Sequence, residues 1–157
     1  MKEVFLGVSR RLWCHISAII FGFIVVTPIT FMALDRGDPV QILSTNVTGN
    51  AVPGGTISIT WEAIASRPCE GETRAWIVGS NRVIHEYAPR PTVIRSNKWE
   101  RGKYSVEVTL PINIPPGPAI RTAAVKYFCN PLQRLLDWPI TATRNVYFEI
   151  GSKPDNA

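Results

Sequence analysis

Cys69 and Cys129 are the residues of this sequence best suited to chemistry, as a disulfide, a nucleophile or a metal ligand. A cysteine nucleophile needs a neighbouring base, and His85 is the single histidine beyond the apolar N-terminal segment. Two cysteines and one distant histidine also do not match the ligand spacing of a zinc site. The sequence therefore gives little support to a thiol-dependent enzyme and predicts no metal site.

Other patterns that would indicate catalysis are missing from the sequence. It contains neither a glycine-rich phosphate loop nor a G-x-S-x-G nucleophile elbow. Glu70 and Glu72 form a carboxylate pair, but Arg67 and Arg74 lie beside them, which is typical of surface charge in a solvated loop. We therefore expect a protein that is not an enzyme and that needs no cofactor.

The composition is that of a folded protein with a mild positive charge. Hydrophobic residues make up 45% of the chain and charged residues 18%, which excludes a disordered chain. A formal charge of +5 over 157 residues is too small to indicate nucleic acid, so we expect no nucleic-acid partner. The length allows one domain and an accessory segment.

Residues 12–34 form an apolar stretch that predicts a transmembrane helix. The stretch has no charge unless its histidine is protonated, and its length suits the ~20 residues that a helix needs to cross the hydrocarbon. Lys2, Arg10 and Arg11 precede it, and basic flanks stay in the cytoplasm. We therefore predict a single-pass membrane protein with a cytoplasmic tail over residues 1–11 and a periplasmic or extracellular C-terminal domain.

A cleaved signal peptide is the alternative interpretation of this stretch. A signal peptide has a short apolar core with small residues before the cut. Here the core is long, and the bulky Phe31 lies at the start of Phe31-Met32-Ala33, the only plausible cleavage motif. A retained signal anchor is the better interpretation, and the lipid bilayer is then an expected partner.

Beyond residue 39, hydrophobic residues follow a period of two. Apolar and polar side chains alternate over residues 56–63, 102–110 and 123–129, which indicates half-buried antiparallel strands. Turn signals rich in proline and glycine separate these runs. The predicted strands cover residues 40–48, 56–65, 73–79, 82–88, 92–96, 102–110, 119–129 and 145–150.

Seven or eight short strands with turns between them predict an all-β fold. The expected architecture is an antiparallel β-sandwich over residues 40–150, preceded by the transmembrane helix. A linker over residues 35–39 joins the two parts, and residues 151–157 are predicted to be a disordered tail.

Three motifs resemble those of the immunoglobulin-like and fibronectin type III-like β-sandwich superfamily. VPGGTISITWEA resembles the entry into a B strand with Trp61 in the core, GKYSVEVTLP resembles an E strand, and Tyr127-Phe128-Cys129 resembles the end of an F strand. The resemblance implies that the B–C and F–G loops share one pole. Cys69, at the start of the B–C loop, should then form a disulfide with Cys129. Cys69 lies beyond the place of an antibody-type cysteine, which argues against a close immunoglobulin relative.

The segment from residue 130 to residue 145 is predicted as a long loop rich in apolar side chains. In a sandwich of this kind it lies at the pole where strand A begins, and because the linker is short, that pole should face the bilayer. The loop either caps the open end of the core or docks a partner. The residues predicted for this partner-binding or membrane-proximal loop are Leu132, Arg134, Leu135, Leu136, Trp138 and Ile140.

A second candidate surface is basic. Its positive charge could bind an anionic envelope polymer, and the alternative is a solvated sheet edge whose charge discourages strand pairing. The residues of this possible anionic-ligand surface are Arg82, Arg90, Arg95, Lys98, Arg101 and Lys103.

These features lead us to expect a non-catalytic, membrane-anchored module that mediates protein–protein interaction at the membrane surface. Such modules are similar to small accessory proteins of bacterial envelopes and tailed phages, and a membrane or envelope protein is the expected partner. The alternative function is recognition of an anionic envelope polymer by the basic surface.

Overall fold

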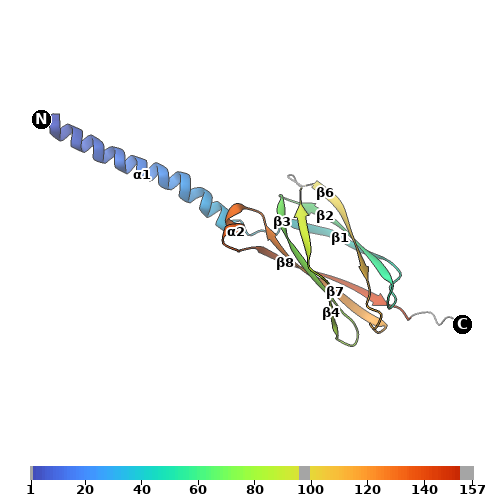
Figure 1. The fold of residues 1–157 in the computed structure, drawn as a ribbon. Helices are drawn as coiled ribbons and strands as arrows, with labels where there is room; N and C mark the ends of the chain where they lie inside the picture. Colours follow the sequence, from blue (N-terminus) through green and yellow to red (C-terminus); the bar gives the residue numbers. More distant parts are fainter. Residues whose placement is uncertain (1, 96–99, 153–157) are drawn as a thin grey trace.

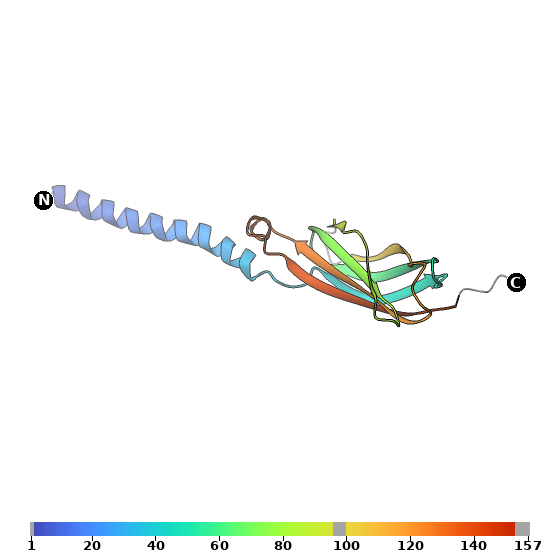
Figure 2. The same ribbon diagram turned by 60° about the horizontal axis from the view of Figure 1, so that its bottom comes forward.

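The computed structural model of the chain describes residues 2–95 and 100–152. One long helix, α1 (Lys2–Leu34), leads into a β-rich body. The body continues roughly along the direction of the helix, so the molecule is elongated (Figure 1). Figure 2 shows the same arrangement from a second side, with the two chain ends at opposite ends of the molecule. Within α1, residues His15–Leu34 are apolar and long enough to cross a membrane.

The body consists of antiparallel strands, so its predicted all-β antiparallel character is confirmed. The strands of the described residues form two sheets, one with the order β1-β2-β6 and one with the order β4-β3-β7-β8, in which β5 also pairs with β3. Their bounds are β1 (Val40–Gly49), β2 (Thr56–Ala65), β3 (Cys69–Val78), β4 (Ile84–Glu86), β5 (Arg90–Ile94), β6 (Glu100–Thr109), β7 (Gly117–Phe128) and β8 (Ile140–Ile150).

The period of two in the sequence explains why these segments are strands. In β2, Ile57 and Ile59 are fully buried, because alternate side chains of a strand point to the same face. Ser58 lies between them on the solvent face, where its hydroxyl is 2.9 Å from that of Ser105 on β6. Each sheet thus presents one apolar face to the other sheet and one polar face to water.

The core between the two sheets is divided into two clusters. The larger cluster lies in the half of the body farther from α1 and includes Ile57, Ile59, Ile77, Val108, Leu110, Ile114, Val146 and Ile150. The smaller cluster lies in the half nearer to α1 and consists of Cys69, Val125, Tyr127, Ile140 and Ala142, with partly buried neighbours. Trp61 and Arg121 lie between the clusters in the strand register, in a part of the interior that is less tightly filled.

The prediction of a long loop up to residue 145 is wrong in its second half. A short helix, α2 (Pro131–Leu135), begins the connection, and β8 begins at Ile140. Ile140 is 5% exposed and belongs to the smaller core cluster, so its assignment to an interaction loop was incorrect. The reason is that Ile140 has the same strand parity as the buried Ala142, and the alternation of β8 therefore begins at Ile140.

Further predictions concern Cys69, Lys98 and the C-terminal tail. Cys69 is the first residue of β3, whereas the sequence places it in a loop before that strand. Lys98 of the basic surface and residues 153–157 of the predicted tail lie outside the described residues.

Candidate functional site

Cys69 and Cys129 form a disulfide, in agreement with the sequence prediction. Cys69 begins β3 and Cys129 follows β7, and their neighbours Glu70 and Phe128 are partners in the register of these two strands. The bond therefore joins adjacent strands of one sheet at the end of the body nearer to α1. In this bonded state neither cysteine has a thiolate to act as a nucleophile.

The residues after the disulfide fold into a short, capped helix that contacts the end of α1. Asn130 is the N-cap of α2, because its side-chain oxygen accepts a hydrogen bond from the Gln133 backbone N–H at 2.9 Å, and Pro131 occupies the first turn. The Asn130 side-chain amide also donates to the Met32 carbonyl of α1 at 3.1 Å. One side chain thus caps α2 and links it to the last turn of α1.

Gln133 is the most buried side chain of this connection, with 1% exposure. Its amide nitrogen donates to the Asp35 carbonyl at 2.8 Å, and its amide oxygen accepts from the Cys129 backbone N–H at 2.8 Å. Gln133 therefore links the chain after α1 to the disulfide. This role of Gln133 was not predicted, although an N-cap residue followed three positions later by glutamine is a sequence signature of a helix start.

Trp138 completes the contact between the body and the residues after α1. The guanidinium of Arg36 lies 4.1 Å from the centre of the Trp138 ring and donates to the Trp138 carbonyl at 3.1 Å. On the other side, Arg67 forms an ion pair with Asp35 and a hydrogen bond to the Gly37 carbonyl. The end of α1 and the body are thus joined by several independent contacts, which we call the helix junction.

Of the other residues of the predicted loop, some are exposed to solvent and others contact the body. Leu135 is 81% exposed and Leu136 58% exposed, so these two leucines do not cap the core. Leu132 is half-buried, and the exposed Arg134 forms an ion pair with Glu70 at 2.7 Å. The predicted apolar surface beside α1 is therefore reduced to Leu135, Leu136 and part of Trp138.

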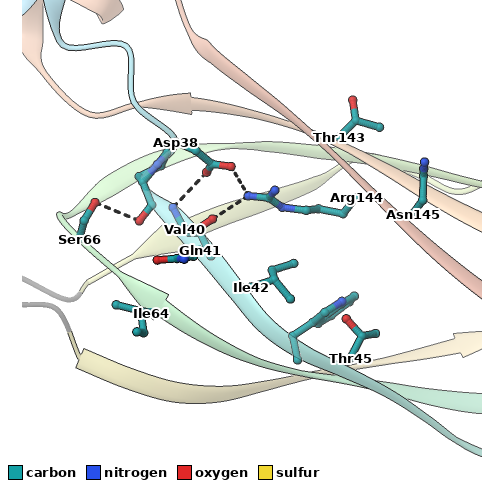
Figure 3. A pocket seen from close by; sticks show the side chains of 12 residues that line it. Asp38, Val40, Gln41, Ile42, Thr45, Ile64, Ser66, Thr143, Arg144 and Asn145 are labelled. Carbon is teal, nitrogen blue, oxygen red and sulfur yellow. Dashed lines mark hydrogen bonds and ion pairs between the residues drawn. The ribbon is translucent and has the colours of Figure 1, made fainter.

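A groove of about 550 Å³ lies between β1 and β8. In the described part of the chain, β1 pairs only with β2 and β8 only with β7, so each strand keeps one open edge. Arg144 extends from β8, forms an ion pair with Asp38 and donates to the Val40 carbonyl at 2.7 Å, which bridges the two strands at one end (Figure 3). Further lining residues are Gln41, Ile42 and Thr45 of β1 and Thr143 and Asn145 of β8.

A second hollow, a cavity of about 440 Å³, lies between the two sheets on the side of β5 and β6. The two hollows adjoin each other and share the lining residues Val40, Ile42, Trp61 and Arg144. Arg121 of β7 is 6% exposed and also lines the cavity, and the sequence analysis did not single it out. Its position on the apolar parity of β7, between Ala119 and Ala123, is the signal that could have revealed it.

The predicted basic residues that the structure describes are distributed over several elements of both sheets. Arg82 lies in the turn between β3 and β4, at the end of the body far from α1, whereas Arg101 lies on β6 opposite Ile64, at the near end. Arg101 is also paired with Glu62 at 2.7 Å, and this hydrogen bond lowers the pKa of the Glu62 carboxyl. Arg90 and Arg95 belong to β5 and the residue after it, in the other sheet, and Lys103 lies on β6.

Over residues 2–95 and 100–152, no group of three or more His, Cys, Asp and Glu side chains is placed to hold a metal ion.

The solved structures that resemble this chain include two bacterial proteins, each with weak similarity. No family model matches the chain, and neither does any curated protein. The alkylpurine DNA glycosylase AlkC from Pseudomonas fluorescens, bound to DNA containing an abasic site analog, has a TM-score of 0.40 at 15% identity, over 73% of this chain and 31% of the glycosylase. A protein from Bordetella pertussis named ApaA has a TM-score of 0.41 at 15% identity, over 76% of this chain and 98% of that protein. The chain spans less than a third of the glycosylase.

The predicted set of partners needs correction. The expected set excluded nucleic acid, whereas one of the similar structures is bound to DNA, so this exclusion is withdrawn. Neither similar structure is named as a membrane or envelope protein, so the comparisons do not support the bilayer or such a protein as a partner. At a TM-score of 0.40 the likeness does not assign DNA to this chain either.

Proposed function

We propose that the chain is a non-catalytic, membrane-anchored interaction module of the immunoglobulin-like class, which binds an extended polypeptide segment along the groove between β1 and β8. The observation that carries this proposal is the groove of about 550 Å³ between two strands with open edges. An open edge offers backbone N–H and C=O groups to an added strand, and the neighbouring side-chain pockets supply selectivity.

The strand order supports the immunoglobulin-like assignment. In the lettering of such sandwiches, β1, β2 and β6 correspond to strands A, B and E, and β4, β3, β7 and β8 correspond to C′, C, F and G. Strands A and G are then the two edges on one side of the sandwich. The proposed binding groove thus lies between β1 (strand A) and β8 (strand G).

The anchoring role rests on α1 and the helix junction. The helix is long and apolar enough to span a bilayer, and its basic N-terminal flank favours a cytoplasmic N-terminus. Contacts from Asn130, Gln133 and Trp138 hold the body against the residues that end the helix. An anchored body held in this way keeps the groove at a fixed place and direction relative to the helix.

The length of β8 supports binding by strand addition. The strand has 11 residues, and natural proteins usually cover, shorten or charge an edge of that length, because it can pair with other chains. Here the charge of Arg144 points inward and is neutralised by Asp38, while Thr143, Asn145 and Tyr147 face solvent. The outer edge of β8 therefore remains available for pairing.

Site-specific photo-crosslinking tests the proposal in cells that express the full chain. A photoreactive phenylalanine analogue at position 143 and, separately, at position 145 is expected to crosslink one polypeptide, and mass spectrometry identifies the residue that each reaches. Because strand side chains on one face are two residues apart, the two crosslinks should fall two residues apart on the bound segment.

Position 126 provides the matched control. Lys126 is exposed on β7, a central strand whose two edges are both paired. The proposal predicts no specific crosslink from this position. Equal crosslinking at position 126, no crosslink from positions 143 and 145, or crosslinks scattered over the bound protein would each contradict binding by strand addition.

A further inference from the structure

Two arginines lie on the inward faces of neighbouring strands, where apolar side chains are expected. On β7, Arg121 has the same parity as the buried Ala119 and Ala123. On β8, Arg144 lies opposite Ala123 in the register, so the two arginines are diagonal neighbours on one face of the sheet. Both guanidinium groups are thus directed into the space between the sheets.

The two arginines differ in what they bind. Arg144 pairs with the Asp38 carboxylate and donates to the Val40 carbonyl. Arg121 is 6% exposed, and its Nε and Nη1 atoms have no hydrogen-bond partner among the described residues. The ring of Trp61, with its centre 5.8 Å from the guanidinium carbon, is an aromatic neighbour but not an anion.

An unpaired guanidinium inside a protein is costly, because its charge and its N–H groups lose water without compensation. Burial accordingly lowers the pKa of Arg121 from its ordinary value. The positive charge of Arg90 lowers this pKa further, and Tyr87 raises it. A buried donor without an acceptor therefore requires a reason for its retention, and a missing anion is the simplest one.

The cavity beside Arg121 has the size and lining of a small-molecule site. Its volume of about 440 Å³ falls within the roughly 300–1,000 Å³ typical of ligand pockets. Small side chains on the inward faces leave this space open. Lining residues of the apolar part include Trp61, Ala63, Ala75, Tyr87, Val106 and Ala123.

The charge around the cavity favours an anion. The charged lining residues are Arg90, Arg121, Arg144 and Glu107. Glu107 is exposed and alternates with the inward-facing Val106 and Val108, so its carboxylate lies on the outer face of β6. The lining therefore supplies no inward-facing carboxylate to neutralise Arg121.

The cavity is open to solvent between β5 and β6 in the described part of the chain. Val93 of β5 is 57% exposed and Tyr104 of β6 is 48% exposed, and both line the cavity. Tyr104 is exposed although it has the inward parity of the buried Val108, which shows that the two sheets do not close against each other at this point. A small molecule can enter there without separating the sheets.

We propose that this cavity binds a small apolar molecule that carries one carboxylate group, with Arg121 as its counter-ion. The carboxylate would accept hydrogen bonds from the unpaired Nε and Nη1 atoms of Arg121, whose planar guanidinium matches the two carboxylate oxygens. The apolar part would occupy the space lined by Trp61 and Ala123. The cavity adjoins the proposed polypeptide groove and shares Val40, Ile42, Trp61 and Arg144 with it, whereas Arg121 lines the cavity alone.

Calorimetric titration of the full chain in lipid nanodiscs with 2-naphthoate tests the site, with empty nanodiscs as the reference for partition into lipid. The neutral isostere 2-naphthamide measures the contribution of the charge. We expect 2-naphthoate to bind at least about tenfold more tightly than 2-naphthamide, because hydrogen bonds between charged groups supply that difference. Equal affinity for the two probes, or no binding of 2-naphthoate at millimolar concentration, would overturn the proposal.

Three variants test whether Arg121 is the counter-ion and whether the probes occupy the cavity. Arg121→Gln should weaken 2-naphthoate binding at least about tenfold and leave 2-naphthamide unchanged, because it removes the charge but little volume. Ala123→Leu should weaken both probes by filling the cavity. Lys126→Gln removes an exposed charge from the same strand and should change neither affinity.

Circular dichroism and a cooperative thermal transition establish that each variant is folded. If Arg121→Gln is folded and binds 2-naphthoate as the original chain does, Arg121 is not the counter-ion. The same conclusion follows if Lys126→Gln weakens binding as much as Arg121→Gln.

Discussion

Replacement of both Cys69 and Cys129 by alanine is expected to lower the free energy of unfolding by about 4 kcal/mol. The disulfide closes a loop with a sequence separation of 60 residues, and the chain-entropy relation for a loop of this length gives that magnitude. Urea unfolding of the full chain in nanodiscs, followed by tryptophan fluorescence, measures the change. The midpoint should fall strongly.

The control for this experiment is Cys14→Ala, which leaves the disulfide intact and should not move the urea midpoint. Reduction of the unsubstituted chain should reproduce the double variant. A double variant within ~1 kcal/mol of the original chain would show that the disulfide does not constrain the unfolded state as the sequence separation requires.

Substitution of Arg121 by methionine is expected to have a large effect in the opposite direction. The variant should be more stable by about 1–4 kcal/mol, the range found when buried ion pairs are replaced by apolar residues of similar volume, because Arg121 has no ion-pair partner that the substitution would leave unpaired. The reason is that Arg121 is buried with two guanidinium nitrogens unpaired, whereas a methionine side chain loses nothing by burial. Urea unfolding in the absence of any added carboxylate measures the gain.

Arg144→Met is the matched comparison, because Arg144 lies on the same inward face but is paired. Its removal leaves the Asp38 carboxylate and the Val40 carbonyl without their partner, so stability should fall by about 1–3 kcal/mol. Opposite signs for the two arginines would show that pairing decides their energetic effect. If Arg121→Met is as destabilising as Arg144→Met, then Arg121 stabilises the fold, and its retention does not need a ligand to explain it.

The strands were largely predictable from the sequence, because alternation of side chains is a local property. The run from Thr56 to Ala65 was predicted with the bounds of β2, since its inward residues are apolar and its outward residues polar. The start of β8 was missed because Arg144, a charged residue at the inward parity, interrupts the apolar face between Ala142 and Val146. Only the packing of Ile140 and Ala142 against the smaller core cluster marks this segment as a strand.

The candidate sites were much less predictable, because they depend on which strands become neighbours. Arg121 has a visible sequence signal, a charge at an apolar parity, but its lack of a partner depends on the positions of Asp38 and Glu107 in three dimensions. The groove depends on β1 and β8 being edges of different sheets, which no local pattern specifies. Likewise, the contact of Gln133 with Asp35 joins residues 98 positions apart.

We propose that the body lies on the outer side of the membrane that α1 spans, and the accessibility of a single cysteine tests this sidedness. Ser152 is exposed at the far end of the body, so Ser152→Cys, placed in a Cys14→Ala chain, provides one free thiol. Bacterial spheroplasts that express this chain are treated with a membrane-impermeant maleimide before and after permeabilisation. We expect full labelling before permeabilisation, and the labelled chain should be full-length and stay in the membrane fraction after an alkaline carbonate wash. Labelling only after permeabilisation, or a shorter chain released into solution, would contradict this proposal.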